Sequence, residues 1–162
     1  MSIEAEMTVL KRLGFFACLP EQQLRALVFG AERMRLHEGH ELYQKGDIAD
    51  CAYIVLGGRV DLFHPVRRSL GADRRIKEYR QVVYAVKAGT LLGAFALISD
   101  KRRETGAYIA QRGDVLRINR TSFRRQLQQS ADMRSRLYAY IFANFQSMTM
   151  RLENRAQALA SA

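Results

Sequence analysis

The stretch GDIADCAYIVLGGRVDLF, residues 46–63, decides the fold that this sequence predicts. It holds CAYIVL (51–56) and the start of RVDLFHPV (59–66), two segments rich in β-branched and other apolar residues, with Gly57 and Gly58 between them. Such segments favour strands, and glycine favours a turn because it adopts backbone conformations that other residues avoid. We therefore predict a β-hairpin around the two glycines.

The chain on both sides of this stretch has the same short-strand character. RMRLHEGHELYQKGD (33–47) is typical of strands broken by glycine turns, and RQVVYAVKAGTLLG (80–93) and GAYIAQRGDVLRIN (106–119) add two or more strands. VRRSLGADRRIKEYR (66–80) carries six cations and two acids. We expect it to form an exposed hairpin tip or loop within an all-β middle region.

Helical periodicity marks both ends of the chain. Residues 3–13 and 19–30 space their apolar side chains three or four apart, and a short helix is expected at 94–99. From residue 120 onward the pattern is helical again, with apolar positions that step by three and four. These positions are Tyr138, Ile141, Phe145, Met148, Leu152 and Leu159, with Arg155 as a charged interruption.

This seam has the spacing of a coiled-coil heptad repeat. The helix either packs against its own β region or pairs with its copy in a second chain. Its length favours a homodimer through the C-terminal helix.

The charge of the chain is unevenly placed. The 162 residues carry a formal net charge of +10. Residues 1–66 hold 7 basic and 9 acidic side chains, whereas residues 67–162 hold 19 basic and 7 acidic ones. The asymmetry favours an anionic partner for the second half, whether a nucleotide, a nucleic acid, a lipid surface or an acidic protein. A solvated basic surface is the alternative.

The residue types needed for catalysis or metal binding do not occur in suitable patterns. Cys18 and Cys51 lie in apolar surroundings without CxxC spacing, which favours buried free thiols and a reducing compartment. Asp47 and Asp50 are expected to stabilise a turn by accepting backbone N–H groups rather than to form a catalytic pair. The three histidines, for which surface or structural roles are expected, are His37, His40 and His64. We predict no enzyme, cofactor or metal site.

The sequence also carries no sign of membrane insertion or export. No apolar run approaches the roughly 18 residues that span a bilayer. The N-terminus lacks the basic and apolar regions of a signal peptide. A cytoplasmic protein without a transmembrane segment is expected.

Several segments, in order and with matching gaps, resemble the cyclic nucleotide-binding domains of the catabolite activator protein, protein kinase A regulatory subunits and cyclic-nucleotide-gated channels. The resemblance covers roughly residues 10–150. LPEQQLRAL (19–27) is similar to the family's first helix, and the stretch 46–63 to its strand-turn pattern. AGTLLGAFALI (88–98) and VLRINRTSFRRQL (115–127) are similar to its cassette and to its closing strand and hinge helix.

The resemblance implies a mainly β fold with flanking helices. It is an antiparallel β-roll, or jelly roll, with N-terminal helices and a long C-terminal helix. The implied organisation is a single domain over residues 1–162, with the roll at about 31–119 and the C-terminal helical region at about 120–160.

The resemblance also implies a phosphate-binding cassette in LLGAFALISDKRRETGAY, residues 91–108. Gly93 matches the cassette glycine, and Arg103 matches the arginine that makes a charge-assisted contact with a cyclic phosphate. The candidate ligand-binding residues are Gly93, Ala94, Phe95, Ala96, Arg102, Arg103, Glu104 and Thr105. The candidate lid residues, on the C-terminal helix, are Tyr138, Ile141 and Phe142. Phe95 and Leu97 are expected to pack in the core.

The cassette departs from the family pattern at three positions. Ala94 stands where the family has a glutamate that accepts the ribose 2′-hydroxyl. Losing a hydrogen bond to a charged group costs about 1.5–3 kcal/mol, or roughly ten- to a hundredfold in affinity. Arg102 replaces a proline, and Glu104 replaces a small residue. Glu104 either pairs with Arg103 or points outward.

Two functions therefore stay open. The leading hypothesis, because Arg103 is in register, is a stand-alone regulatory module that binds cAMP or cGMP and signals through an unidentified partner protein. The alternative is a retuned or degenerate cassette that binds another ligand such as cyclic di-GMP, or a ligand-free protein-interaction module. DNA is not an expected partner, because the chain ends at Ala162 without room for the helix-turn-helix domain of the DNA-binding members.

Overall fold

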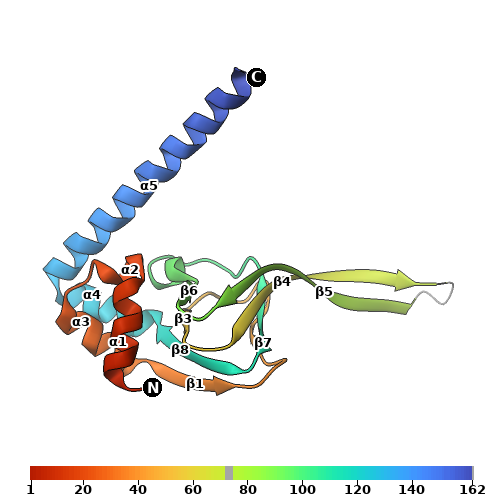
Figure 1. Cartoon of the computed structure of the whole chain (residues 1–162), viewed down its shortest axis with the longest axis horizontal. Helices are drawn as coiled ribbons and strands as arrows, with labels where there is room; N and C mark the ends of the chain where they lie inside the picture. Colours follow the sequence, from red (N-terminus) through yellow and green to blue (C-terminus); the bar gives the residue numbers. More distant parts are fainter. Residues whose placement is uncertain (72–74, 162) are drawn as a thin grey trace.

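The chain folds into two antiparallel sheets flanked by helices (Figure 1). The structure is a computed structural model that describes residues 1–71 and 75–161, without the side chains of residues 147–149. The helices are α1 (Ile3–Arg12), α2 (Gly14–Ala17), α3 (Glu21–Gly30), the short 3₁₀ helix η1 (Ala94–Leu97), α4 (Arg120–Gln129) and α5 (Ala131–Ala160). The predicted helices at the two ends and at the cassette are confirmed.

Eight strands form the two sheets of a β-roll, as predicted. They are β1 (Glu32–Leu36), β2 (Glu41–Tyr43), β3 (Cys51–Val55), β4 (Arg59–Leu70), β5 (Arg75–Lys87), β6 (Thr90–Leu92), β7 (Gly106–Gln111) and β8 (Gly113–Asn119). One sheet has the order β1-β8-β3-β6 and the other the order β2-β7-β4-β5. Every strand pair in the register is antiparallel.

The predicted hairpin around Gly57 and Gly58 is wrong. Strand β3 pairs with β6 and β8, whereas β4 pairs with β5 and β7, so the two glycines connect different sheets. Gly58 has a φ of +76°, and a Cβ there would lie 2.4 Å from the carbonyl oxygen of Gln111. The glycines thus let the connection between β3 and β4 lie close to the connection between β7 and β8. They do not form a hairpin turn between two paired strands.

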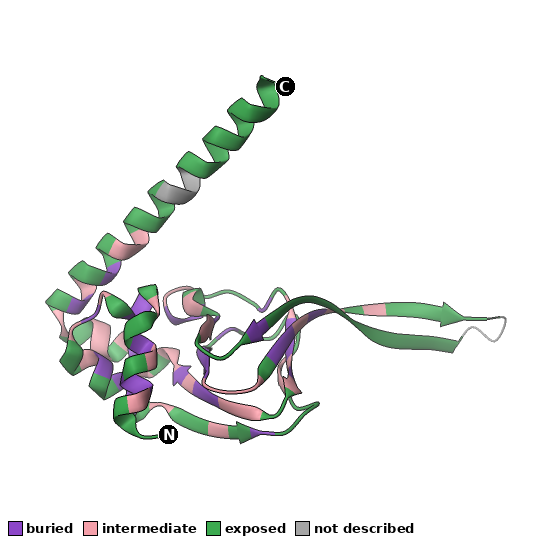
Figure 2. Ribbon diagram, viewed as in Figure 1, coloured by how far each residue is buried: buried purple, intermediate pink, exposed green. Residues whose placement is uncertain are grey.

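Strands β4 and β5 form a long arm that projects from the roll (Figure 1). Their pairing runs from Arg59 opposite Lys87 to Leu70 opposite Arg75, but β7 pairs with β4 only as far as Phe63. Beyond that point the ribbon is almost wholly exposed (Figure 2). The exposed hairpin predicted for residues 66–80 is confirmed, apart from 72–74, which lie outside the described residues.

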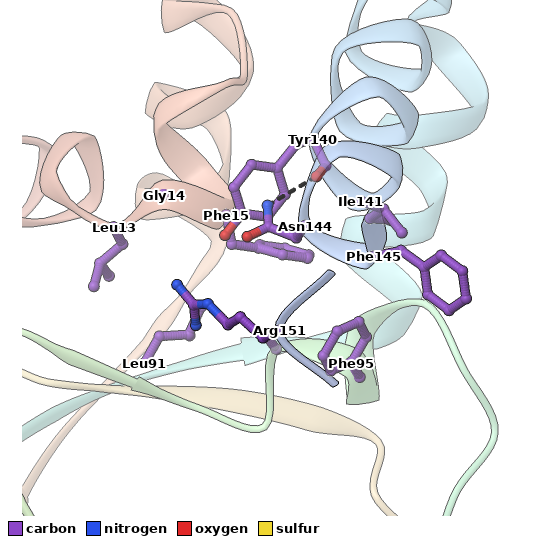
Figure 3. Close-up of a pocket in the computed structure, with 11 residues that line it drawn as sticks. Leu13, Gly14, Phe15, Leu91, Phe95, Tyr140, Ile141, Asn144, Phe145 and Arg151 are labelled. Atoms are coloured by element: carbon purple, nitrogen blue, oxygen red, sulfur yellow. Dashed lines mark hydrogen bonds between the residues drawn. The ribbon is translucent and has the colours of Figure 1, made fainter. Parts of the chain in front are cut away.

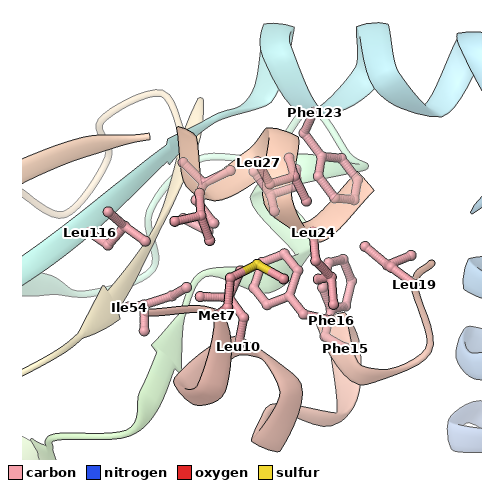
Figure 4. Packing of buried hydrophobic residues seen from close by; sticks show 14 of the residues in the cluster. Met7, Leu10, Phe15, Phe16, Leu19, Leu24, Leu27, Ile54, Leu116 and Phe123 are labelled. Atoms are coloured by element: carbon pink, nitrogen blue, oxygen red, sulfur yellow. The ribbon is translucent and has the colours of Figure 1, made fainter. Parts of the chain in front are cut away.

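Two hydrophobic clusters hold the fold together. The first lies between the helices and the sheet that contains β3 and β8 (Figure 4). Its members include Met7, Leu10, Phe15, Phe16, Leu24, Leu27, Ile54, Leu97, Leu116 and Phe123. The second fills the space inside the roll, and its members include Cys51, Tyr53, Val55, Val60, Leu92, Ile109 and Val115. Leu92 at the end of β6 belongs to the second cluster and Leu97 of η1 belongs to the first. The cassette glycine between them therefore lies where the two clusters meet.

Helix α5 leaves the body of the molecule after its first turns (Figure 1). Ser130 caps it, since its hydroxyl accepts the backbone N–H of Met133 at 3.1 Å. Met133 and Leu137 are fully buried, but most of the described side chains after Ile141 are exposed (Figure 2). The predicted seam position Met148 lies outside the described side chains. Among the described residues, no helix is long and apolar enough to cross a membrane.

Candidate functional site

The cassette begins with a turn that only glycine fits. Gly93 has a φ of +71°, in the left-handed region that side chains with a Cβ disfavour. A Cβ at this position would lie 2.5 Å from Nη1 of Arg103 and 3.6 Å from the carbonyl oxygen of Cys51. The glycine is therefore needed both for the backbone turn and for the approach of the guanidinium.

Backbone hydrogen bonds tie Arg103 to the start of the stretch that decides the fold. The N–H of Arg103 donates to the carbonyl oxygen of Asp47 at 2.8 Å, and the N–H of Gly46 donates back to the Arg103 carbonyl at 2.8 Å. The Asp47 carboxylate accepts the N–H of Gln44 at 2.9 Å, as expected of a turn residue. The Gly-Asp turn thus positions the cassette arginine.

The guanidinium of Arg103 is buried and only partly hydrogen-bonded. The residue is 7% exposed, and its Nη2 donates to the Cys51 carbonyl oxygen at 2.6 Å. Its Nε is buried with no acceptor among the described residues, and none of the ion pairs between them includes Arg103. Burying a cation without a counter-ion is costly, so an anion bound at this side chain would be strongly favoured.

Two tyrosines provide the aromatic surface on which this guanidinium lies. The guanidinium carbon of Arg103 is 4.2 Å from the centre of the Tyr43 ring and 5.9 Å from that of Tyr53. The two rings stack with centres 6.0 Å apart. Burial raises the pKa of the Tyr43 phenol above its ordinary value, although the positive charge of Arg103 opposes this shift. Both rings therefore face the positive charge of Arg103.

Sequence reasoning missed both tyrosines. Tyr53 lies in the quoted stretch, but strand periodicity assigns it only to the core. Tyr43 comes from β2, and no local pattern relates it to the cassette. The pairing of β2 with β7 brings it beside Arg103.

The other predicted ligand residues have different surroundings. Arg102 is exposed, and its Nη1 donates to the carbonyl oxygen of Gly46 at 2.9 Å. Glu104 is also exposed, and within the described chain it forms no ion pair with Arg103. Thr105 is half-buried and Ala96 is buried. The side chain of Glu104 therefore leaves Arg103 free of a carboxylate.

The cassette helix presents one aromatic side chain outward. Leu97 is fully buried, as expected, but Phe95 is 63% exposed, so its predicted place in the core is wrong. In a single 3₁₀ turn, three residues complete the circle, and the burial of Ala96 and Leu97 leaves Phe95 on the outer side.

Phe95 borders a pocket of about 600 Å³ between α2, η1 and α5 (Figure 3). Ala94 also lines this pocket, on the helical side of the cassette, together with Phe15, Tyr140 and Ile141. The hydrophobic side chains of this region thus link the cassette to the first turns of α5.

The candidate lid residues do not cover Arg103 in this conformation. Ile141 packs against the helical cluster, whereas Tyr138 and Phe142 are exposed on α5. The helix itself points away from the roll (Figure 1).

Comparison with known proteins is consistent with this geometry. The family profile described as cyclic nucleotide-binding domain matches residues 33–130. A cyclic nucleotide-binding-like protein from Brucella abortus is 39% identical, with a TM-score of 0.63 over 75% of this chain and 97% of that one. The N-terminal domain of a transcriptional regulator from Streptomyces coelicolor is 21% identical, with a TM-score of 0.73 over 89% of this chain and 94% of that one.

Two further similarities concern parts of larger proteins. The regulatory domain of Toxoplasma gondii PKA, solved with cAMP, is 20% identical, with a TM-score of 0.62 over 75% of this chain and 43% of that one. Patatin-like phospholipase domain-containing protein 7 of Rattus norvegicus is 27% identical over 111 residues, which are 68% of this chain. The chain spans only 7% of the length of that protein, so the similarity concerns one region of it.

Proposed function

Because this chain belongs to the cyclic nucleotide-binding domain family, we propose that it is a regulatory module that binds a cyclic nucleotide inside its β-roll. The observation that carries the proposal is the buried Nε of Arg103, which has no acceptor among the described residues. A cyclic phosphate is a monoanion, and it would supply both the missing acceptor and the missing negative charge.

The residues around Arg103 have the properties that such a ligand needs. Gly93 leaves room for the guanidinium at the start of the cassette, and the backbone of residues 93–96 would line the phosphate. The face of the Tyr43 ring contacts the guanidinium, and this contact is worth about 0.5–2 kcal/mol. Each charge-assisted hydrogen bond to a phosphate is worth about 1.5–3 kcal/mol, so two such bonds outweigh the aromatic contact.

The proposed output is a change in contacts with a partner protein. The module would act without catalysis, in the cytoplasm, and as a dimer through α5. A ligand bound beside η1 would alter the position of the exposed Phe95, which borders the same pocket as Ile141 of α5. A shift of α5 relative to the cassette would then transmit binding to the partner.

A second candidate is favoured by a specific feature of the cassette. Ala94 offers no carboxylate for a ribose hydroxyl, which favours a ligand recognised by its phosphate alone, such as cyclic di-GMP. A protein-interaction module without a small-molecule ligand is the remaining alternative.

Isothermal titration with cAMP, cGMP and cyclic di-GMP separates these functions. We expect cAMP or cGMP to bind well below about 1 mM, the concentration that corresponds to about −4 kcal/mol. Arg103→Ala should weaken binding by about a hundredfold or more. Lys101→Ala is the matched control, since it removes an exposed cation two residues away that is not among the candidate ligand-binding residues, and it should change affinity less than about threefold.

Each other result points to a different function. Binding of cyclic di-GMP alone would favour the retuned cassette. No binding of any of the three nucleotides at millimolar concentration would favour the protein-interaction module. Full affinity in Arg103→Ala would place the ligand elsewhere.

A further inference from the structure

The outer part of the arm formed by β4 and β5 extends beyond the other strands of both sheets. We call residues 64–70 and 75–81 the outer ribbon, since β7 pairs with β4 only from Arg59 to Phe63. The outer ribbon therefore has two strands and two open edges. A two-stranded ribbon in water is marginally stable alone, and its open edges expose unpaired backbone groups.

The pairing register gives the outer ribbon one face on which every charged side chain is basic. Side chains of directly opposed residues point to the same face of an antiparallel pair. One face carries the pairs Val66–Tyr79, Arg68–Lys77 and Leu70–Arg75. It therefore holds three cations and no carboxylate, and we call it the basic face. On the opposite face, Arg67 stands opposite Glu78.

The three cations of the basic face lack counter-ions. Arg68, Arg75 and Lys77 are exposed, and within residues 1–71 and 75–161 no ion pair joins any of them to a carboxylate. Arg68 and Lys77 are directly opposed, an arrangement that repels. Lys77 places its ammonium 5.5 Å from the centre of the Tyr79 ring.

The cation at the base of the arm, Arg80, contacts a carboxylate and two aromatic rings. Arg80 pairs with Glu41 at 2.5 Å and lies over the rings of Phe63 and Tyr108, at 5.2 and 4.5 Å. This arginine holds the arm to the sheet. Within the described chain, the three cations of the basic face form no ion pair. Their positive charge is therefore available to a partner.

Apolar side chains are interleaved with these cations. Leu70 is 49% exposed on the basic face, and Ile76 is 70% exposed on the opposite face, one residue from Arg75 and from Lys77. A shallow pocket of about 430 Å³ on the arm is lined by Val66, Arg68, Leu70 and Tyr79, with Arg80 and Gln81. The outer ribbon therefore combines positive charge with exposed aliphatic and aromatic surface.

We propose that the outer ribbon docks on the surface of a bilayer that contains anionic phospholipids. Cations near such a surface are attracted to the headgroups, while tyrosine and aliphatic side chains gain from the boundary with the acyl chains. A nucleic acid would satisfy the three cations, but it would leave Leu70, on the same face, exposed to water. The arm projects from the roll, so it reaches a flat surface without obstruction by the sheets (Figure 1).

Vesicle flotation with the full chain tests the charge part of this proposal. We expect binding to vesicles of phosphatidylcholine mixed with phosphatidylserine, weak binding to phosphatidylcholine alone, and loss of binding as salt rises. Replacing Arg68, Arg75 and Lys77 together with serine should weaken binding about a hundredfold, at roughly fivefold for each cation. The matched control replaces three exposed cations on other elements, Arg12, Lys45 and Arg112, with serine, which changes the net charge equally.

The apolar part is tested by the double variant Leu70→Ser/Tyr79→Ser, which changes two side chains of the basic face. It leaves the charge unchanged and should weaken vesicle binding about tenfold, since part of each side chain would leave the acyl boundary. Equal weakening in the control triple variant, or full binding in the double variant, would overturn the proposal. Tight binding of duplex DNA that survives the double variant but not the basic-face variant would identify a nucleic-acid surface instead. Circular dichroism checks that each variant is folded.

Discussion

The guanidinium of Arg103 lies 4.2 Å from the centre of the Tyr43 ring, and its Nε has no acceptor among the described residues. The cassette arginine is thus held in the roll by an aromatic face rather than by a carboxylate. The contact connects β2 to the cassette and keeps the positive charge inside the roll.

Stability should depend more on the ring of Tyr43 than on its hydroxyl, which interacts with Thr105. Tyr43→Phe keeps the surface that faces Arg103 and loses only the hydroxyl, so it should lower the free energy of unfolding by about 0.5–1 kcal/mol. Tyr43→Leu removes the aromatic face and should lower it by about 1–2 kcal/mol. Urea denaturation of both variants measures the difference, and equal stability of the two would show that the aromatic contact contributes nothing.

Two glycine substitutions distinguish a general loss of stability caused by backbone strain from a specific loss of nucleotide affinity. Gly93→Ala and Gly89→Ala both put a Cβ at a positive φ, of +71° and +84°, and each should cost about 1–2 kcal/mol of stability. A Cβ at Gly89 meets nothing within 4 Å, whereas one at Gly93 meets the Arg103 guanidinium. Calorimetric titration should therefore show a loss of nucleotide affinity of at least tenfold for Gly93→Ala alone. A similar loss in Gly89→Ala would mean that the effect is general destabilisation.

The ribose hydroxyl should contribute little to affinity. Ala94 lacks the carboxylate that would accept it, and this residue borders the pocket on the helical side of the cassette. The 2′-deoxy form of the nucleotide that binds is therefore expected to have an affinity within about threefold of the ordinary form. A tenfold or larger difference, about 1.4 kcal/mol, would reveal another acceptor for the hydroxyl.

Helix α5 should form a dimer through its exposed apolar stripe. Tyr138, Phe145 and Leu152 are each about 60% exposed and stand seven residues apart along the helix. Light scattering should give a dimer mass, and Leu152→Glu should weaken dimerisation at least tenfold. Ala143→Glu, exposed on the opposite side of the helix, is the control and should leave the dimer intact. A monomer mass for the unmodified chain at every concentration would exclude this contact.

Local patterns predicted the elements better than their pairing. The helices and the short strands follow from apolar periodicity and turn glycines, which act over a few residues. Strand pairing depends on contacts between distant segments. Gly57 and Gly58 therefore looked like a hairpin turn, although β3 and β4 lie in different sheets.

Some residues of the candidate site could likewise be predicted from local sequence patterns, and others could not. Arg103 and Gly93 could be located from the order of motifs along the chain, and the structure brings them together. Tyr43 could not, because only the pairing of β2 with β7 carries it to Arg103. The exposure of Phe95 depends on the length of a single helical turn, which apolar character alone does not determine.

The NMR signal of the Arg103 Nε–H group tests the central proposal most directly. It can be assigned in a ¹H–¹⁵N spectrum by its absence from Arg103→Lys. On titration with the cyclic nucleotide that binds, this proton should move strongly downfield, because an N–H without an acceptor gains a charged phosphate oxygen. A nucleotide that binds and leaves the Arg103 Nε–H signal unmoved would contradict a phosphate site at Arg103.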